Sequence, residues 1–71
     1  MATTIHESDT ANLPRLLSIK ELSRYLDVPV SSIYRWRSEG RGPLGFKVGK
    51  EVRFRETDVL TWLEQLAVRN P

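Results

Sequence analysis

The first regular segment of the chain is marked by apolar residues at three- and four-residue spacing, namely Ile19, Leu22, Tyr25 and Leu26. This spacing predicts an amphipathic helix over about residues 19–26. Ser18 and Glu21 have the spacing of a capping box, in which each satisfies a backbone donor at the helix start. Leu17 and Leu22 have the spacing of a hydrophobic staple. We therefore expect ordered structure to start at Leu17.

A second short helix is predicted after a turn of about three residues. Asp27-Val28-Pro29 ends the first helix, because proline disfavours helical geometry at the residue before it. Pro29 is itself tolerated in a first turn, so the next helix is predicted over about residues 29–38, with Gly40 as its C-terminal stop. Two short helices joined in this way have the spacing of a helix-turn-helix.

The second helix divides into an inner and an outer side when Ile33 is placed at the centre of the core face. The inner side then carries Pro29, Val30, Ile33, Trp36 and Arg37. The outer side carries Ser31, Ser32, Tyr34, Arg35 and Ser38. The outer side is therefore polar and carries a cation.

A β-hairpin is predicted after the glycine-rich loop of residues 40–45. Apolar residues alternate on two short stretches around a three-residue turn, Gly49-Lys50-Glu51; they are Phe46, Val48, Val52 and Phe54. The alternation turns three cations the other way, Lys47, Arg53 and Arg55. Because an isolated hairpin is marginal in water, its aromatic face is expected to pack on the helices.

A third helix is predicted from Glu56 or Thr57, with an apolar stripe of Val59, Trp62, Leu63 and Leu66. Core packing, rather than base stacking, is expected of four aromatic residues, Trp36, Phe46, Phe54 and Trp62.

Residues 1–14 have no periodicity and carry a charge of −2, which predicts a disordered arm. The domain is then residues 15–71. Arms that enter DNA grooves are basic, so no DNA contact is expected of this one.

Composition makes an enzyme the least expected class. The 71 residues suffice for one domain with a thin core. The chain has no cysteine and one histidine, His6, so no disulfide, thiolate metal site or catalytic triad can be assembled. We expect no cofactor, metal or small-molecule ligand. Nothing resembles a signal peptide or a membrane span, so we expect an intracellular, cytoplasmic protein with no membrane partner.

The distribution of charge is more informative than the net charge of +2. Residues 35–55 hold seven basic and two acidic residues, a balance of +5, while the remaining residues hold four basic and seven acidic, a balance of −3. A segregated positive segment indicates a polyanionic partner such as nucleic acid.

These motifs together resemble the MerR-like winged helix-turn-helix of excisionase-type proteins over about residues 16–66. The matching segments are Leu17-Ser18-Ile19-Lys20-Glu21-Leu22, Leu26-Asp27-Val28-Pro29, Ile33-Tyr34-Arg35-Trp36-Arg37-Ser38-Glu39-Gly40, Gly42-Pro43, Lys47-Val48-Gly49-Lys50, Val52-Arg53-Phe54-Arg55, Asp58-Val59 and Trp62-Leu63. Two positions depart from the pattern. Many members have an aliphatic residue at Arg37, and a serine or threonine cap is frequent at Pro29.

The resemblance implies a mostly α fold with a small β-hairpin wing. It implies a phage or mobile-element protein that binds double-stranded DNA, with the second helix in the major groove and the wing in the adjacent minor groove. Such an excisionase bends attachment-site DNA and directs integrase-mediated excision, so the implied partners are an integrase and further copies of the chain bound cooperatively. It performs no covalent chemistry and acts in the cytoplasm of a bacterial host.

The candidate DNA-binding residues are Arg24, Ser31, Ser32, Tyr34, Arg35, Arg37, Ser38, Arg41, Lys47, Lys50, Arg53 and Arg55. Arginine to guanine is the commonest specific contact in the major groove, so Arg35 is a candidate base reader, although it could contact phosphate or remain solvated. Short hydroxyls in the first turn of a helix can approach phosphate or instead cap the helix. The hairpin cations can enter a narrow groove or protect a strand edge. Arg55 alone can pair with its neighbour Glu56.

Two other functions remain open from the sequence. A small transcriptional regulator could use the same domain, binding cooperatively as repeated monomers. A protein-interaction module or antitoxin-like partner would instead use the helix of Trp62 or the acidic arm. The segregated charge favours DNA over the interaction module.

Overall fold

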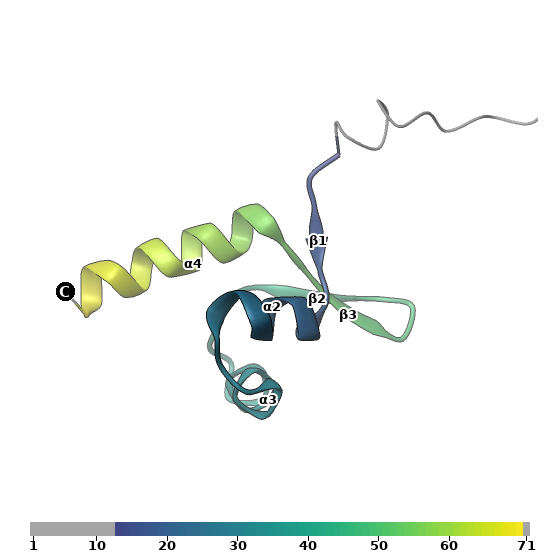
Figure 1. Cartoon of the computed structure of the whole chain (residues 1–71), viewed down its shortest axis with the longest axis horizontal. Helices are drawn as coiled ribbons and strands as arrows, with labels where there is room; N and C mark the ends of the chain where they lie inside the picture. The colour runs from purple at the N-terminus through teal and green to yellow at the C-terminus, as the bar shows by residue number, and fades with distance from the viewer. Residues whose placement is uncertain (1–12, 71) are drawn as a thin grey trace, which may run out of the picture.

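The computed structural model describes residues 13–70. The predicted arm over residues 1–14 therefore lies almost entirely outside the described residues. The elements are β1 (Leu16–Leu17), α2 (Ile19–Leu26), α3 (Val30–Ser38), β2 (Gly45–Val48), β3 (Glu51–Arg55) and α4 (Glu56–Arg69). Three helices and a small antiparallel sheet confirm the predicted mostly α fold with a hairpin wing (Figure 1). We call β2, β3 and their turn, residues 45–55, the wing.

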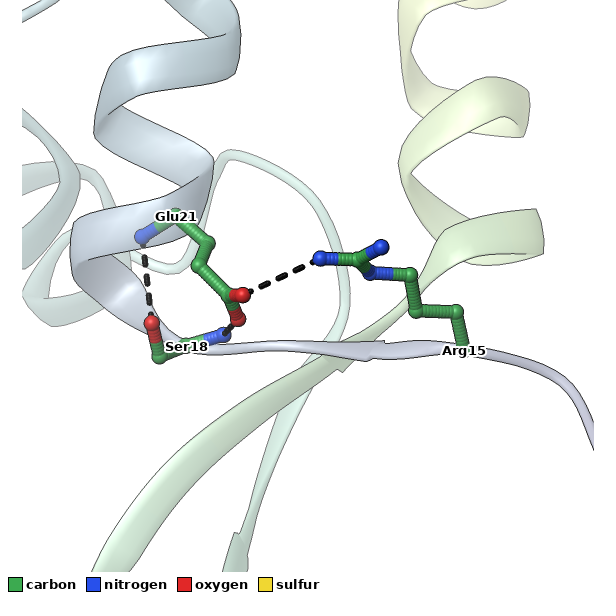
Figure 2. A network of polar contacts seen from close by, with 3 residues as sticks. All are labelled: Arg15, Ser18 and Glu21. Carbon is green, nitrogen blue, oxygen red and sulfur yellow. Dashed lines mark hydrogen bonds and ion pairs between the residues drawn. The ribbon is translucent and has the colours of Figure 1, made fainter. Parts of the chain in front are cut away.

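The start of α2 is closed by the predicted capping box (Figure 2). The Ser18 hydroxyl accepts from the Glu21 backbone N–H at 3.1 Å, and a Glu21 carboxylate oxygen accepts from the Ser18 N–H at 2.9 Å. Arg15 donates to the other carboxylate oxygen at 3.1 Å. These bonds lower the pKa of Glu21, and the largest contribution is the backbone hydrogen bond from Ser18. The network ties the strand before α2 to its first turn.

The turn between α2 and α3 is held by backbone and by one hydroxyl. Asp27 has a left-handed backbone with φ of 57°, which aspartate tolerates better than most residues. The Val28 N–H donates to the Ser23 carbonyl at 3.1 Å, and the Ser23 hydroxyl donates to the Val28 carbonyl. The three-residue turn predicted from the sequence is confirmed.

The third element, α3, starts one residue later than predicted, because Pro29 is its N-cap and not its first helical residue. No side chain caps this start, because proline occupies position 29, where a capping serine or threonine is frequent in similar sequences. The end of α3 is closed in a Schellman motif, in which Gly40 has φ of 74°. There the Arg41 N–H donates to the Trp36 carbonyl at 2.8 Å.

The sheet has a third strand that the sequence pattern did not predict. Its order is β1-β3-β2, and β1 pairs antiparallel with β3 through Leu16 opposite Arg55 and Leu17 opposite Phe54. Ordered pairing therefore begins one residue before Leu17. Two residues are too few to show the alternation by which a strand is recognised.

The turn of the wing has two residues, and the predicted three-residue turn is wrong. Val48 pairs with Glu51, so only Gly49 and Lys50 form the turn, and Glu51 belongs to β3. Gly49 has φ of 66° at the first turn position, which requires the conformational freedom of glycine. This change moves the pairing by one residue: Phe46 lies opposite Arg53, and Gly45 opposite Phe54.

This register corrects the predicted faces of the hairpin. Side chains opposite one another share a face, so Phe46 lies on the face of Arg53 and not on that of Phe54. Lys47 lies opposite Val52, on the core side, and not with Arg53 and Arg55. The prediction that Phe46 packs in the core is also wrong, because its ring lies under the Arg55 guanidinium, 4.7 Å from the ring centroid.

One core joins the helices to the central strand. Its buried side chains are Ile19, Leu22, Ile33, Phe54 and Val59. Trp36 packs against this core, and its ring lies 5.4 Å from that of Trp62, centroid to centroid. Figure 1 shows α4 leaving the end of β3 and running away from the wing.

Candidate nucleic-acid interface

The outward face of α3 is exposed and polar. Ser31, Tyr34, Arg35 and Ser38 are exposed, as predicted, while Ser32 is half-buried. Arg35 forms no ion pair within residues 13–70. The predicted inner side is correct for Ile33, but Pro29 is exposed at its end. The helix therefore presents a cation flanked by hydroxyl groups.

The hydroxyl groups of α3 differ in what they do within the fold. Neither Ser31 nor Ser32 caps the helix, since the start has no side-chain cap. The Ser38 hydroxyl donates to the Arg35 carbonyl at 2.9 Å, a bond confined to the last turn. The hydroxyls of the first turn thus remain available to a ligand.

The cations of the wing fall into two groups. Lys47 and Lys50 are exposed and make no ion pair among the described residues. Arg53 donates to the Val52 carbonyl at 2.8 Å and lies 3.9 Å from Glu51.

Arg55, on the same face as Arg53, has local partners of its own. Its guanidinium lies 3.4 Å from Asp58, and not against the neighbouring Glu56. The same guanidinium covers the Phe46 ring. The four cations predicted to act as one set are therefore divided between two faces and between paired and unpaired states.

Arg37 lies where α3 meets the start of the wing. It is half-buried and forms no ion pair among residues 13–70. A Cβ added to Gly45 would lie 3.1 Å from an Arg37 guanidinium nitrogen and 2.6 Å from the Phe54 ring. Gly45 thus lets both side chains approach β2 closely. Gly45 was not among the site residues predicted from the sequence, although a glycine in a strand often marks the close approach of another group.

The remaining two candidates lie away from the outward face of α3. Arg41 pairs with Glu39 at 2.7 Å and lines a hollow of about 420 Å³ beside Trp36 and Trp62. Arg24 is exposed on α2 and lines a second hollow, of about 510 Å³, between β1, α2 and α4. No helix within residues 13–70 is both long and apolar enough to cross a membrane.

A family model described as a helix-turn-helix domain matches residues 16–67. The chain belongs to this helix-turn-helix domain family. No curated protein and no solved structure matches it. The matched helix-turn-helix domain extends from β1 almost to the end of α4, so it includes the wing as well as the two helices.

Membership of the helix-turn-helix family implies sequence-specific binding of double-stranded DNA. In such domains the second helix of the motif reads the major groove, and the first crosses the backbone. In this helix-turn-helix domain α2 is the first helix, and α3, with its exposed Arg35, is the second.

Proposed function

We propose that the chain binds duplex DNA with α3 in the major groove and the wing in the adjacent minor groove. The observation that carries this proposal is the position of three exposed cations that form no ion pair within residues 13–70. Arg35 lies on the outward face of α3, Lys50 at the tip of the wing, and Lys47 on the sheet face that packs towards the helices. A phosphate can bind these cations without displacing a carboxylate.

The candidate residues then differ in their expected effect on binding. Arg41, Arg53 and Arg55 must exchange an existing partner for a phosphate. Their contribution to affinity is reduced by that exchange, although they remain in the proposed contact set. Arg24, Ser31, Ser32, Tyr34, Arg37 and Ser38 complete the set. Arg24 is on the helix that crosses the backbone.

The salt dependence of binding tests the DNA-binding mode. If about five phosphates are neutralised, the logarithm of the affinity should fall against the logarithm of salt concentration with a slope of about −4 to −5. Lys50→Met should make this slope shallower by about one and leave the sequence preference unchanged. Arg69→Met, at the far end of α4, is the matched control and should keep the full slope. A wild-type protein with no salt-dependent duplex binding would refute the DNA-binding proposal.

We further propose an excisionase-type role, in which the chain bends attachment-site DNA and directs an integrase towards excision. The resemblance of residues 16–66 to such proteins supports this role. A single module buries only about 600–1,000 Å² on DNA, so useful specificity needs several copies bound side by side or a partner such as an integrase. The module proposed to do this is residues 15–71.

A bending and recombination assay separates this role from that of a small transcriptional regulator. The excisionase role predicts that the protein bends a duplex carrying its site and raises excision by the integrase of the same element. It also predicts a footprint that extends when integrase is added. Binding within a promoter with no effect on recombination would instead favour the regulator. If the protein bound no duplex at all, the protein-interaction module would be the remaining candidate function.

A further inference from the structure

The junction between α3 and the wing has a defined position relative to DNA. Adjacent major and minor grooves are separated by one sugar-phosphate strand. If α3 occupies the major groove and the wing the minor groove, as proposed above, that strand must pass the place where α3 and the wing meet. The inference rests on that binding mode and concerns the side chains that this sugar-phosphate strand contacts at the junction.

Two cations lie at this junction on the same side of the sheet. Arg37, near the end of α3, reaches the start of β2 with its guanidinium beside Gly45. Lys47 lies two residues further along β2, on the same face as Gly45, which corresponds to about 7 Å of strand. Neither cation forms an ion pair within the described part of the chain.

The fold holds Arg37 at this place without neutralising it. Gly45 has no side chain, so the guanidinium and the Phe54 ring both pack close to the backbone of β2. A half-buried cation is less screened by salt and solvent than an exposed one. Arginine can also grip phosphate oxygens with two parallel N–H groups, while lysine acts as a point charge.

We propose that Arg37 and Lys47 together bind one backbone phosphate between the two grooves, and we call this two-cation site the seat. Gly45, which has no side chain, leaves the room that Arg37 occupies. The seat fixes the position of α3 relative to the wing on the duplex and carries no base preference of its own. The competing explanation is that Arg37 only covers Phe54 with its aliphatic stem.

The experiment combines single-residue variants with single neutral phosphates. Methylphosphonate is placed at one phosphate at a time along a duplex selected for binding, and the affinities of wild type, Arg37→Met, Lys47→Met and Arg69→Met are measured. Methionine keeps an unbranched apolar side chain and removes the charge. Thermal unfolding of each variant reports whether the fold is retained.

The seat predicts that affinity depends most strongly on one phosphate, which lies between the major-groove and minor-groove contacts. Neutralising it should weaken wild type and the Arg69→Met control about tenfold or more, as expected for a hydrogen bond to a charged group. It should weaken Arg37→Met and Lys47→Met much less, because part of the contact is already lost. Each variant should lower affinity alike on specific and random DNA, with a salt slope shallower by about one. Arg37→Lys should restore the slope and only part of the affinity.

Two results would overturn the seat. Arg37→Met could keep the wild-type slope, methylphosphonate response and unfolding temperature, which would make Arg37 only a cover for the core through its aliphatic stem. Alternatively, the slope could change with no single phosphate coupled to Arg37, which would make its charge a diffuse contribution. A wild type that binds no duplex refutes the proposed function itself, so the two failures are distinguishable.

Discussion

The two helices of the helix-turn-helix begin in opposite ways. α2 begins with a complete capping box, and Arg15 adds a second partner to its Glu21 carboxylate. α3 begins at Pro29 with no side-chain cap, and its exposed cation Arg35 has no acidic partner within residues 13–70. The two helices nevertheless each place a side chain in the same core, Leu22 and Ile33.

This difference separates stability from binding. Polar groups that are paired within the fold, as at the start of α2, must give up that partner before they can bind a ligand. Ser31 and Arg35 of α3 form no side-chain hydrogen bond or ion pair within residues 13–70, so a ligand can bind them without such an exchange. The last turn of α3 is closed by the Schellman motif around Gly40, so the contrast is confined to its start and outward face.

Truncating a core side chain should lower stability by a similar amount in either helix, because α2 and α3 each contribute a fully buried side chain. Leu22 is 0% exposed and Ile33 1% exposed. We expect Leu22→Ala and Ile33→Ala each to lower the free energy of unfolding by about 2–5 kcal/mol. Denaturant unfolding measures this. A much smaller loss for Ile33→Ala would show that α3 is not anchored as the structure describes.

Replacing Arg35, the exposed cation of α3, should affect binding and not folding. Arg35→Ala is expected to cost about 1–3 kcal/mol on the specific duplex if Arg35 reads a base. The unfolding free energy should change by less than about 0.5 kcal/mol, as for other surface positions. Titration of specific and random duplexes measures the difference. Equal losses on both would identify Arg35 as a phosphate contact and remove base reading from its role.

Serine substitutions at the two helix starts should give unequal losses of stability. Ser18→Ala removes the hydroxyl of the capping box and should lower the unfolding free energy by about 0.5–2 kcal/mol. Ser31→Ala removes no capping bond and should change it by less than about 0.5 kcal/mol. Thermal or urea unfolding of the pair, measured side by side, checks the prediction. Similar losses would mean that α3 is capped in solution.

Acidification should weaken α2 through Glu21, with the smallest effect of the series. The folded-state pKa of this carboxyl lies below its ordinary value, first because the Ser18 N–H donates to it. Its contribution is therefore present above the ordinary glutamate pKa of about 4.3 and is lost as pH falls through the lower folded-state pKa. The urea midpoint of Glu21→Gln should vary less with pH over this range than that of wild type. Parallel curves for the two proteins would contradict the assignment.

Local signals predicted the helices well, because their determinants lie within a few residues. The spacing of Ser18 and Glu21 identified the start of α2, and Pro29 and Gly40 bracketed α3 to within one residue. The apolar stripe from Val59 likewise identified α4. Each of these features depends on one turn of backbone and the side chains beside it.

The sheet was predicted less well, because its determinants are pairings between distant segments. β1 owes its existence to β3, nearly forty residues away, and two leucines show no periodicity alone. The turn at Gly49 and Lys50 is one residue shorter than predicted, and a one-residue slip exchanges the faces of a strand. Phe46 therefore lies on the outer face of the sheet and not in the core, and Lys47 lies on the same side as Arg37. The candidate cations were identified from the sequence, but which of them are paired within the fold depended on this register.

The central place of β3 has a dynamic consequence for the wing. The strand is hydrogen-bonded to β1 on one edge and β2 on the other, and its Phe54 lies in the common core. The end of β3 that carries Phe54, where β1 also pairs, therefore cannot detach without opening the core. The amide hydrogens at this end of β3 should therefore exchange with solvent more slowly than those beside the turn of Gly49 and Lys50. This end of the wing is therefore ordered before any ligand binds, and little conformational entropy remains there to be lost on binding.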